Sequence, residues 1–320
     1  MNILLLLAYN EELFIRESII GNLDLFDKII VVNDNSKDTT RKIVEEISKK
    51  NKNKIELINN PKNFGPGKSF DIGLKYSLNL DFDYLIKSDG DNQFRIEDIK
   101  KILEIAKKNH LDFIKCDRFW TEGISGNIPL IRYIGNAFAS VLIKFVTSNV
   151  NINDPLNGLF LFSKKAAVEI KIPKLFFNYG YPFFINYTMS KLNYSNTELK
   201  LRQFKNIVSY GGQKSNLNAL FMFFKLSYFS LKSFVSLITV KIKFSKFQTS
   251  GILDFVAIFS FITSIYCLIK VILVRLFNFD NNQGAWIILS IIFFMSTFLI
   301  IGISRKNISE HLGDSFSYIN

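Results

Sequence analysis

The sequence predicts an α/β domain with a Rossmann-like sheet, followed by a membrane-associated C-terminal part. In the first half, short apolar runs alternate with longer amphipathic stretches. This alternation is typical of parallel strands joined by crossover helices. From Ala219 onward the apolar residues crowd together, and Phe occurs 33 times in the 320 residues. A chain of this length has room for one sizeable domain and a smaller unit.

Five strands and four helices are expected in the α/β domain. The strands are predicted at 3–8, 28–32, 55–58, 84–87 and 113–116, and the helices at 11–22, 38–50, 68–78 and 96–109. Ligands of open parallel sheets gather at the carboxyl ends of the strands. Polar clusters follow three of the strands, at 9–11, 33–36 and 88–91, so we expect a binding site there.

Three apolar stretches follow the α/β domain. The first carries Lys225 and Lys232 on one helical face, which predicts a helix lying in the membrane interface. The next two, 251–274 and 285–303, reach the length of about 20 residues that crosses a bilayer. Asp254 is expected to reach the headgroups from one of them. The alternative is a pair of buried core helices. The expected units are 1–218 (α/β domain), 219–248 (interfacial helices), 249–304 (two transmembrane helices) and 305–320 (tail).

Basic residues flank the two transmembrane stretches on one side. Three lysines lie between positions 241 and 246, and Arg305 and Lys306 follow the second stretch, whereas the loop between them carries Asp280. The positive-inside rule therefore places the α/β domain and both termini in the cytosol. Basic residues outnumber acidic ones by 40 to 28, but no basic stripe interleaved with aromatic residues occurs in the first 200 positions. Nucleic acid is therefore not an expected partner.

Two carboxylates stand directly after the fourth predicted strand. Asp89 and Asp91 are separated only by Gly90, which lets the backbone come close to a neighbour. A divalent cation held by one or two carboxylates is the usual means of neutralising a diphosphate. Two acids around a glycine are also common in ordinary turns, so this motif alone leaves both interpretations open.

The motifs around this pair resemble family-2 glycosyltransferases. They are, in order, Ala8-Tyr9-Asn10-Glu11-Glu12, the segment 31–40 with Asn33-Asp34, the segment 63–68 ending at Lys68, and Asp89-Gly90-Asp91-Asn92-Gln93. Farther on, Arg118, Arg132, Asn136 and Asp154-Pro155-Leu156-Asn157-Gly158 resemble the polyprenyl-phosphate sugar transferases of the dolichol-phosphate mannose synthase type. The resemblance implies a GT-A fold, a nucleotide-sugar donor, and Mg²⁺ or Mn²⁺. The two-span C-terminal variant of that family matches the apolar stretches.

The resemblance also implies roles for individual residues. The implied donor-binding residues are Ala8, Tyr9, Asn10, Glu11, Asn33, Asp34, Lys68 and Asp89; the implied metal ligands are Asp89, Asp91 and Gln93. The implied catalytic residues are Asp89, Asp91 and Asp154, and the implied acceptor-phosphate residues are Arg118, Arg132, Asn136 and Lys214. The family usually has two acids where this chain has Asn33-Asp34, which leaves the nucleobase open. Capping of the helix 38–50 is the alternative role for Asp34 and Ser36.

The acceptor is expected to be a polyprenyl phosphate, either undecaprenyl or dolichyl. A phosphate is already an anion and needs no general base, and no acid occurs at 179–186, where hydroxyl-directed members of the family carry one. Transfer to a hydroxyl of a lipid-linked oligosaccharide or surface glycan, with Asp154 as base, is the alternative. A non-catalytic scaffold is the third hypothesis. The sequence leaves open the sugar and the oligomeric state, a homo-oligomer included.

Overall fold

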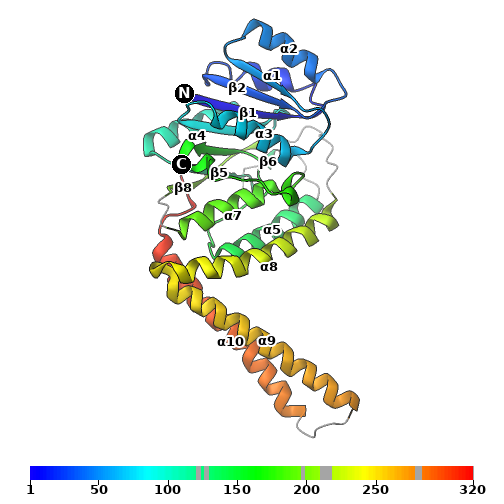
Figure 1. Ribbon diagram of the computed structural model, residues 1–320, viewed down its shortest axis with the longest axis vertical. Coiled ribbons are helices and arrows are strands. Elements are labelled where there is room, and N and C mark those ends of the chain that lie inside the picture. The colour runs from blue at the N-terminus through cyan, green and yellow to red at the C-terminus, as the bar shows by residue number, and fades with distance from the viewer. Residues whose placement is uncertain (120–123, 126–129, 196–198, 210–217, 278–282, 320) are drawn as a thin grey trace.

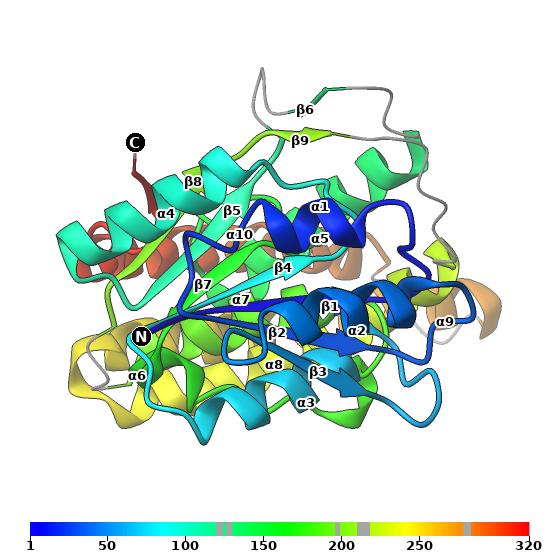
Figure 2. The ribbon, with the colours of Figure 1, turned by 90° about the horizontal axis from the view of Figure 1, so that it is seen from above.

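The computed structural model describes residues 1–119, 124–125, 130–195, 199–209, 218–277 and 283–319. An eight-stranded sheet with helices on both faces forms its upper part, and a long helical hairpin extends away from it (Figures 1 and 2). The strands are β1 (Asn2–Ala8), β2 (Lys28–Asn33), β3 (Ile55–Asn59), β4 (Tyr84–Asp89), β5 (Phe113–Asp117), β7 (Phe160–Ser163), β8 (Leu201–Lys205) and β10 (Ser317–Tyr318), with β6 (Ile124–Ser125) and β9 (Val208–Ser209) as a separate pair. The helices are α1 (Ile15–Ile20), α2 (Thr40–Lys50), α3 (Pro66–Leu78), α4 (Ile96–Asn109), α5 (Leu130–Thr147), α6 (Lys164–Ala167), α7 (Tyr181–Asn193), α8 (Ala219–Lys243), α9 (Gln248–Phe277) and α10 (Gln283–Leu312), with 3₁₀ turns η1 (Lys174–Phe176) and η2 (Ser245–Phe247).

The sheet is mixed rather than wholly parallel, which corrects the expectation of a parallel sheet. Its strand order is β10-β8-β5-β7-β4-β1-β2-β3, and β7 runs antiparallel to both of its neighbours, β4 and β5. The five predicted strands are present. β7, β8 and β10 were not predicted, because they are short and two of them carry polar residues such as Gln203.

Both faces of the sheet are covered, which explains the unbroken apolar run of β1. Leu4 and Leu6 belong to the core under α1, α2 and α4, whereas Ile3, Leu5 and Leu7 belong to the core under α3, α5 and α7. Successive side chains of a strand point to opposite faces, so a strand buried on both sides has no polar alternation. All of these leucines are buried.

Below the sheet, α5, α7 and α8 form a helical layer from which the α9–α10 hairpin projects (Figure 1). Among the described residues, the four helices α5, α8, α9 and α10 are long and apolar enough to cross a membrane by length and composition. The hairpin corresponds to the two predicted transmembrane stretches, although both of its helices extend beyond the predicted limits. Large apolar side chains are exposed along most of it, such as Phe259, Leu268 and Leu299.

A buried ion pair joins the hairpin to the α/β domain. The Lys241 ammonium in α8 lies 2.7 Å from Oδ2 of Asp254 in α9 and donates to Ser148 Oγ at 2.6 Å. Ser304 of α10 donates to Asp254 Oδ1 at 2.7 Å. Asp254 is therefore buried at a helix junction and does not reach the headgroups, which corrects that expectation. A buried charge pair of this kind is costly to break, because the remaining partner is left unpaired.

The segment after α10 returns to the sheet instead of extending as a free tail. Ser317 and Tyr318 pair in parallel with Arg202 and Gln203 of β8. Phe316 is fully buried and contacts the ring of Phe113 at 6.1 Å between centroids. The last described residues therefore form the outermost strand of the sheet.

Candidate active site

The topology brings the polar clusters to one edge of the sheet. Ala8 pairs with Asn33 and Leu7 pairs with Asp89, so the carboxyl ends of β1, β2 and β4 lie next to one another. Because β7 is antiparallel, the chain that enters it arrives at this same edge, with Phe160 opposite Lys87. The motif 154–158 is thereby placed beside the acids that follow β4.

The turn at Asp89-Gly90-Asp91 packs closely against β1. The backbone N–H of Gly90 donates to the carbonyl of Leu7 at 2.9 Å, and a Cβ at Gly90 would lie 2.8 Å from the side chain of Ile15. The glycine is thus required by close backbone approach, as the sequence indicated. Asp91 Oδ1 accepts from the backbone N–H of Gln93 at 3.2 Å, which fixes the second acid within the turn.

A buried lysine stands beside the first acid. Lys87 is fully buried, and its ammonium lies 2.6 Å from Asp89 Oδ1. It also lies 5.5 Å from the ring centroid of Tyr181, in the first turn of α7. The pKa of Lys87 is raised even though burial opposes its charge, because Asp89 attracts the ammonium more strongly. Lys87 therefore holds one oxygen of Asp89 in a fixed position.

The acids Glu11, Asp89 and Asp91 at this edge repel one another. Burial, together with repulsion from Asp91 and Asp89, raises the pKa of Glu11 to about 8. Burial and repulsion from Asp89 also raise the pKa of Asp91 to about 7. Neighbouring carboxyl groups repel one another when they are ionised, and a bound cation stabilises their ionised form. The donor set therefore fits Mg²⁺ or Mn²⁺, which takes one or two carboxylates and completes its shell with water or phosphate oxygens. The described residues contain no group of three or more His, Cys, Asp or Glu that could hold a metal ion.

The loops after β1 and β2 are hydrogen-bonded to each other. Asn10 Oδ1 accepts from the backbone N–H of Lys37 at 2.8 Å, and the N–H of Asn10 donates to Ser36 Oγ at 3.0 Å. Ser36 Oγ in turn donates to Asn33 Oδ1 at 2.6 Å. These bonds shape the segment next to Tyr9, whose side chain is 39% exposed. The loops that carry Asn10 and Asn33 are thus held together.

Asp34 is hydrogen-bonded to a third loop, residues 60–65. Its Oδ1 accepts from Asn60 Nδ2 at 2.7 Å and from the N–H of Phe64 at 2.9 Å, and its Oδ2 accepts from the N–H of Gly65 at 2.8 Å. Neither Asp34 nor Ser36 caps α2, which has Thr39 at its N-cap, so the capping alternative is wrong. Asp34 instead places the loop 60–65 beside the carboxyl end of β2.

The segment that leads into α3 packs against the chain around η1. A Cβ at Gly67 would lie 1.9 Å from the carbonyl oxygen of Phe176, so only glycine fits there. Lys68 makes an ion pair with Asp71 at 2.7 Å, and its ammonium lies 4.6 Å from the ring centroid of Phe177. Lys68 thus lies at this edge of the sheet but already has an anionic neighbour.

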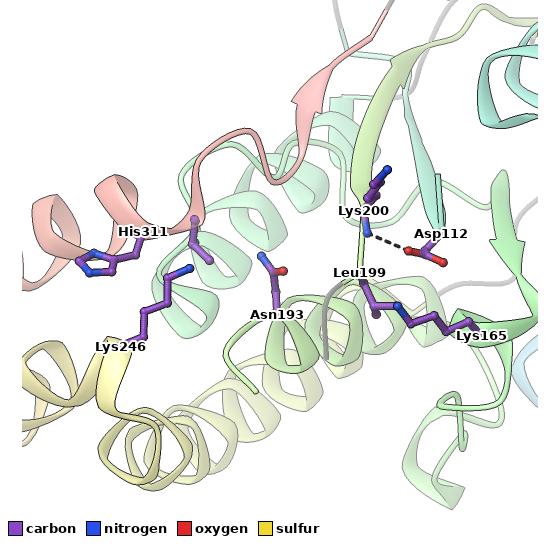
Figure 3. A pocket seen from close by; sticks show the side chains of 8 residues that line it. Asp112, Lys165, Asn193, Leu199, Lys200, Lys246 and His311 are labelled. Atoms are coloured by element: carbon purple, nitrogen blue, oxygen red, sulfur yellow. Dashed lines mark hydrogen bonds between the residues drawn. The ribbon is translucent and has the colours of Figure 1, made fainter. Parts of the chain in front are cut away.

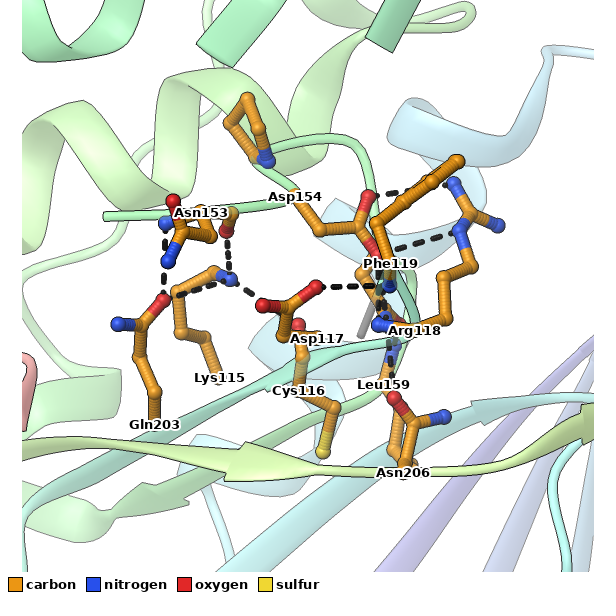
Figure 4. Close-up of polar contacts among 12 residues, drawn as sticks. Lys115, Cys116, Asp117, Arg118, Phe119, Asn153, Asp154, Leu159, Gln203 and Asn206 are labelled. Carbon is orange, nitrogen blue, oxygen red and sulfur yellow. Dashed lines mark hydrogen bonds and ion pairs between the residues drawn. The ribbon is translucent and has the colours of Figure 1, made fainter. Parts of the chain in front are cut away.

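On the other side of β4, an ion pair joins the end of β5 to the motif that precedes β7 (Figure 4). Arg118 Nε lies 3.1 Å from Asp154 Oδ2, and the backbone N–H of Arg118 donates to the same oxygen at 3.1 Å. Burial raises the pKa of Asp154, although Arg118 and Lys115 oppose the shift. A Cβ at Gly158 would lie 2.8 Å from Asp89 Oδ2 and 3.0 Å from the ammonium of Lys87. Gly158 therefore connects this motif directly to the acidic turn.

Two further implied acceptor residues lie on α5. Arg132 is half-buried in the first turn of α5, and Asn136 follows one turn later and is buried. Asn136 Oδ1 has no hydrogen-bond partner among the described residues. Lys214 lies outside the described residues.

Sequence reasoning missed three residues of this edge: Lys87, Asp117 and Tyr318. A lysine within the apolar strand β4, on the same face as Asp89, was a usable signal, since a buried lysine normally needs an anionic partner. Asp117 also ends a buried strand and offered the same kind of signal. For Tyr318 the sequence contains no signal, because its contacts are made across 201 positions.

The cavity in Figure 3 lies elsewhere and is not part of this site. It has a volume of about 500 Å³ and is lined by residues that include Asp112, Lys165, Lys200 and His311. Asp112 and Lys200 precede β5 and β8, so this cavity is at the amino ends of those strands. The acidic turn is at the opposite edge of the sheet.

Comparison with known proteins agrees with this geometry. The family described as Glycosyl transferase family 2 matches residues 4–170. An uncharacterized protein of Methanocaldococcus jannaschii is 40% identical over 136 residues, which are 42% of this chain and 57% of that protein. The UDP-N-acetylglucosamine–dolichyl-phosphate N-acetylglucosaminyltransferase of Methanococcus voltae is 31% identical over 176 residues, which are 51% of this chain and 69% of that enzyme. The chain thus spans little more than half the length of the first of these relatives.

The fold is shared with a solved glycosyltransferase. Glucosyl-3-phosphoglycerate synthase from Mycobacterium tuberculosis, in complex with Mn²⁺, uridine diphosphate and glucosyl-3-phosphoglycerate, superposes with a TM-score of 0.51 at 15% identity. The match covers 74% of this chain and 79% of that one. This likeness confirms the GT-A fold implied by the motifs. With the family match over more than half of its residues, the chain belongs to glycosyl transferase family 2.

Proposed function

We propose that the protein transfers a sugar from a nucleotide-sugar to a polyprenyl phosphate at the cytosolic face of the membrane, with inversion at the anomeric carbon. The observation that carries the proposal is the placement of two sites at one edge of the sheet. Gly158 lies against Asp89 and belongs to the same motif as Asp154, which pairs with Arg118. Donor and acceptor phosphates would therefore meet next to helices that face lipid.

The acidic turn suits the diphosphate of the donor. Asp89, Asp91 and Gln93 would hold Mg²⁺ or Mn²⁺, which when bound neutralises the charge that develops on the leaving diphosphate. Lys87 keeps Asp89 oriented, and Glu11 adds a third carboxylate at the rim. Tyr9 and the hydrogen-bonded loops around Asn33 would border the nucleoside.

Helices α5 and α8 suit a lipid acceptor. They pack against each other, and many large apolar residues on them are exposed: Leu130, Ile131, Tyr133, Ile134 and Val141 on α5, and Leu220, Phe221, Phe224, Tyr228, Leu231 and Val235 on α8. Exposed apolar surfaces of this extent mark membrane or partner contacts. Since Arg132 and Asn136 lie on α5 itself, a phosphate at the bilayer surface would reach them while its polyprenyl chain stays in lipid.

For transfer to a phosphate, the main task of the protein is to position the acceptor phosphate next to the anomeric carbon of the donor. A phosphate monoester oxygen is anionic at neutral pH and can attack the anomeric carbon directly, so no proton has to be removed. Arg132 would hold the phosphate by charge-assisted hydrogen bonds. Arg118 would set the position of the Asp154 loop beneath it. The dolichyl-phosphate acceptor named for the Methanococcus voltae relative supports this acceptor class.

The test is a transfer assay on membranes that contain the protein. Labelled nucleotide-sugars are offered with undecaprenyl or dolichyl phosphate, with and without Mg²⁺ or Mn²⁺. The expected product is a labelled lipid monophosphate that forms only with metal. Label that appears only on preassembled glycans would overturn the acceptor assignment.

Transfer to a hydroxyl is the second candidate, and one observation favours it. Asp154 begins the motif whose Gly158 lies against Asp89, and burial raises the pKa of Asp154, as befits a general base. The Asp154→Asn variant separates the two candidates. If Asp154 is a base, the variant loses transfer but still binds the nucleotide-sugar. If the acceptor is a phosphate, transfer persists in the folded variant and is lowered only as far as the weakened Arg118–Asp154 contact disturbs use of the acceptor.

A further inference from the structure

Residues 315–319, after α10, pack into the α/β domain. The N–H of Phe316 donates to the carbonyl of Leu201 at 3.0 Å, and the N–H of Ile319 donates to the carbonyl of Gln203 at 2.8 Å. Asn151 Nδ2 donates to the carbonyl of Ser315 at 3.2 Å. Together with the buried ring of Phe316, these bonds hold the segment against β8 and the chain before Asp154.

Tyr318 reaches from this strand into the acceptor side of the active site. Its hydroxyl donates to Asp117 Oδ2 and accepts from Asn153 Nδ2 at 2.9 Å. Asp117 directly precedes Arg118, and Asn153 directly precedes Asp154. The hydroxyl of Tyr318 therefore bridges the two segments that carry the Arg118–Asp154 ion pair.

Gln203 makes a second bridge between the same segments. Its Oε1 accepts from the N–H of Asn153 at 3.0 Å and from the buried ammonium of Lys115 at 3.2 Å. Its Nε2 donates to the carbonyl of Phe316 at 2.6 Å. The loop between these anchors includes Asp154 at φ +41°, a left-handed conformation that non-glycine residues adopt only with support.

We propose that Tyr318 is a positioning residue for sugar transfer, acting through Asp117 and Asn153 on the Arg118–Asp154 pair. The inference rests on the proposed function for the identity of the acceptor. Since β10 directly follows α10, the acceptor side is complete only when the chain has returned from the hairpin. Tyr318 therefore affects use of the acceptor and leaves the donor side, at β1, β2 and β4, unchanged.

The test compares Tyr318→Phe with Ser317→Ala in the full-length protein in membranes. Ser317 is its neighbour in the same strand, so its side chain points to the opposite side. Tyr318→Phe removes the hydrogen bond that the tyrosine hydroxyl donates to the buried carboxylate of Asp117. We expect kcat/KM for the acceptor to fall by about tenfold. The KM for the nucleotide-sugar should stay at the wild-type value, as should both constants of Ser317→Ala. A merely structural role would lower the active fraction without separating acceptor from donor.

Hydrogen exchange gives a readout that does not depend on activity. In Tyr318→Phe, amide exchange should speed up in the peptides around 113–118 and 151–157, and remain unchanged around β1 and β2. Wild-type protein that transfers no sugar to polyprenyl phosphate would overturn the acceptor assignment, while the exchange comparison still tests the bridge. If Tyr318→Phe matches Ser317→Ala in both exchange and acceptor kinetics, the positioning role is overturned.

Discussion

The proposed donor side and the proposed acceptor side of the site differ in how far cations balance their acids. On the proposed donor side, Glu11 and Asp91 repel each other and Asp89, and Lys87 makes an ion pair with Asp89. On the acceptor side, the Asp154 carboxylate is already paired with Arg118. The donor side is thus organised for an incoming cation, whereas the acceptor side is fixed by internal pairs and contributes geometry.

The two sides also differ in how the chain builds them. The donor side comes from the loops that follow the parallel strands β1, β2 and β4. The acceptor side combines the end of β5, the entry to β7 and a strand that follows the membrane hairpin. A change on the donor side should therefore affect chemistry more than folding, and a change on the acceptor side should affect both.

The largest expected effect is that of Asp91→Asn on sugar transfer. Loss of one metal ligand should lower kcat/KM by about 1000-fold, which corresponds to about 4 kcal/mol of transition-state stabilisation. Because the substitution also relieves repulsion with Asp89, the melting temperature should not fall. Asp83→Asn, at the other end of β4, is the matched control and should retain activity. A large drop in stability in Asp91→Asn would contradict the charge comparison.

Arg118→Gln should behave in the opposite manner. It leaves the buried Asp154 carboxylate without its cation, and we expect a loss of about 3 kcal/mol in the free energy of unfolding. Denaturant unfolding of the solubilised protein would measure this loss, with Arg16→Gln, in an exposed ion pair, as the control. An unchanged stability would mean that the acceptor side tolerates an unpaired charge as well as the donor side does.

Gly158→Ala tests the contact between the two sides. Its Cβ would be forced within 2.8 Å of Asp89 Oδ2, so the acid or the loop must move. We expect about a thirtyfold loss of kcat/KM and a stability loss of about 1 to 3 kcal/mol. Gly135→Ala in α5, where nothing lies within 4 Å of the new Cβ, is the control. Equal kinetics for the two variants would contradict the contact.

The smallest expected effect is that of pH on metal binding. With pKa values of about 7 for Asp91 and about 8 for Glu11, these groups lose protons as the pH rises through this range. Mn²⁺ affinity, measured by paramagnetic resonance, should rise by about tenfold in all between pH 6 and pH 8 as Asp91 loses its proton. Because the folded protein holds these protons more tightly than the unfolded chain, the metal-free protein should be more stable at pH 6 than at pH 8. Glu11→Gln should weaken the pH dependence of both the metal affinity and the stability.

Much of the donor side could be predicted from the sequence. β1 and β4 are apolar runs followed at once by polar residues, and the parallel arrangement forces those residues to one edge. Gly90 was correctly assigned to a close backbone approach. The capping role considered for Asp34 was wrong, because the carboxylate is taken by the N–H groups of Phe64 and Gly65, which no local pattern reveals.

By itself the sequence determined the alternation of strands and helices, the acids after β4 and the apolar hairpin, because local periodicity and residue type decide these features. Only the tertiary structure decided that β7 runs antiparallel and brings Gly158 against Asp89. The same holds for the burial of Asp254 against Lys241 and the return of Tyr318 to Asp117. These contacts join positions far apart in the chain, where packing and the pairing of buried charge select the partner.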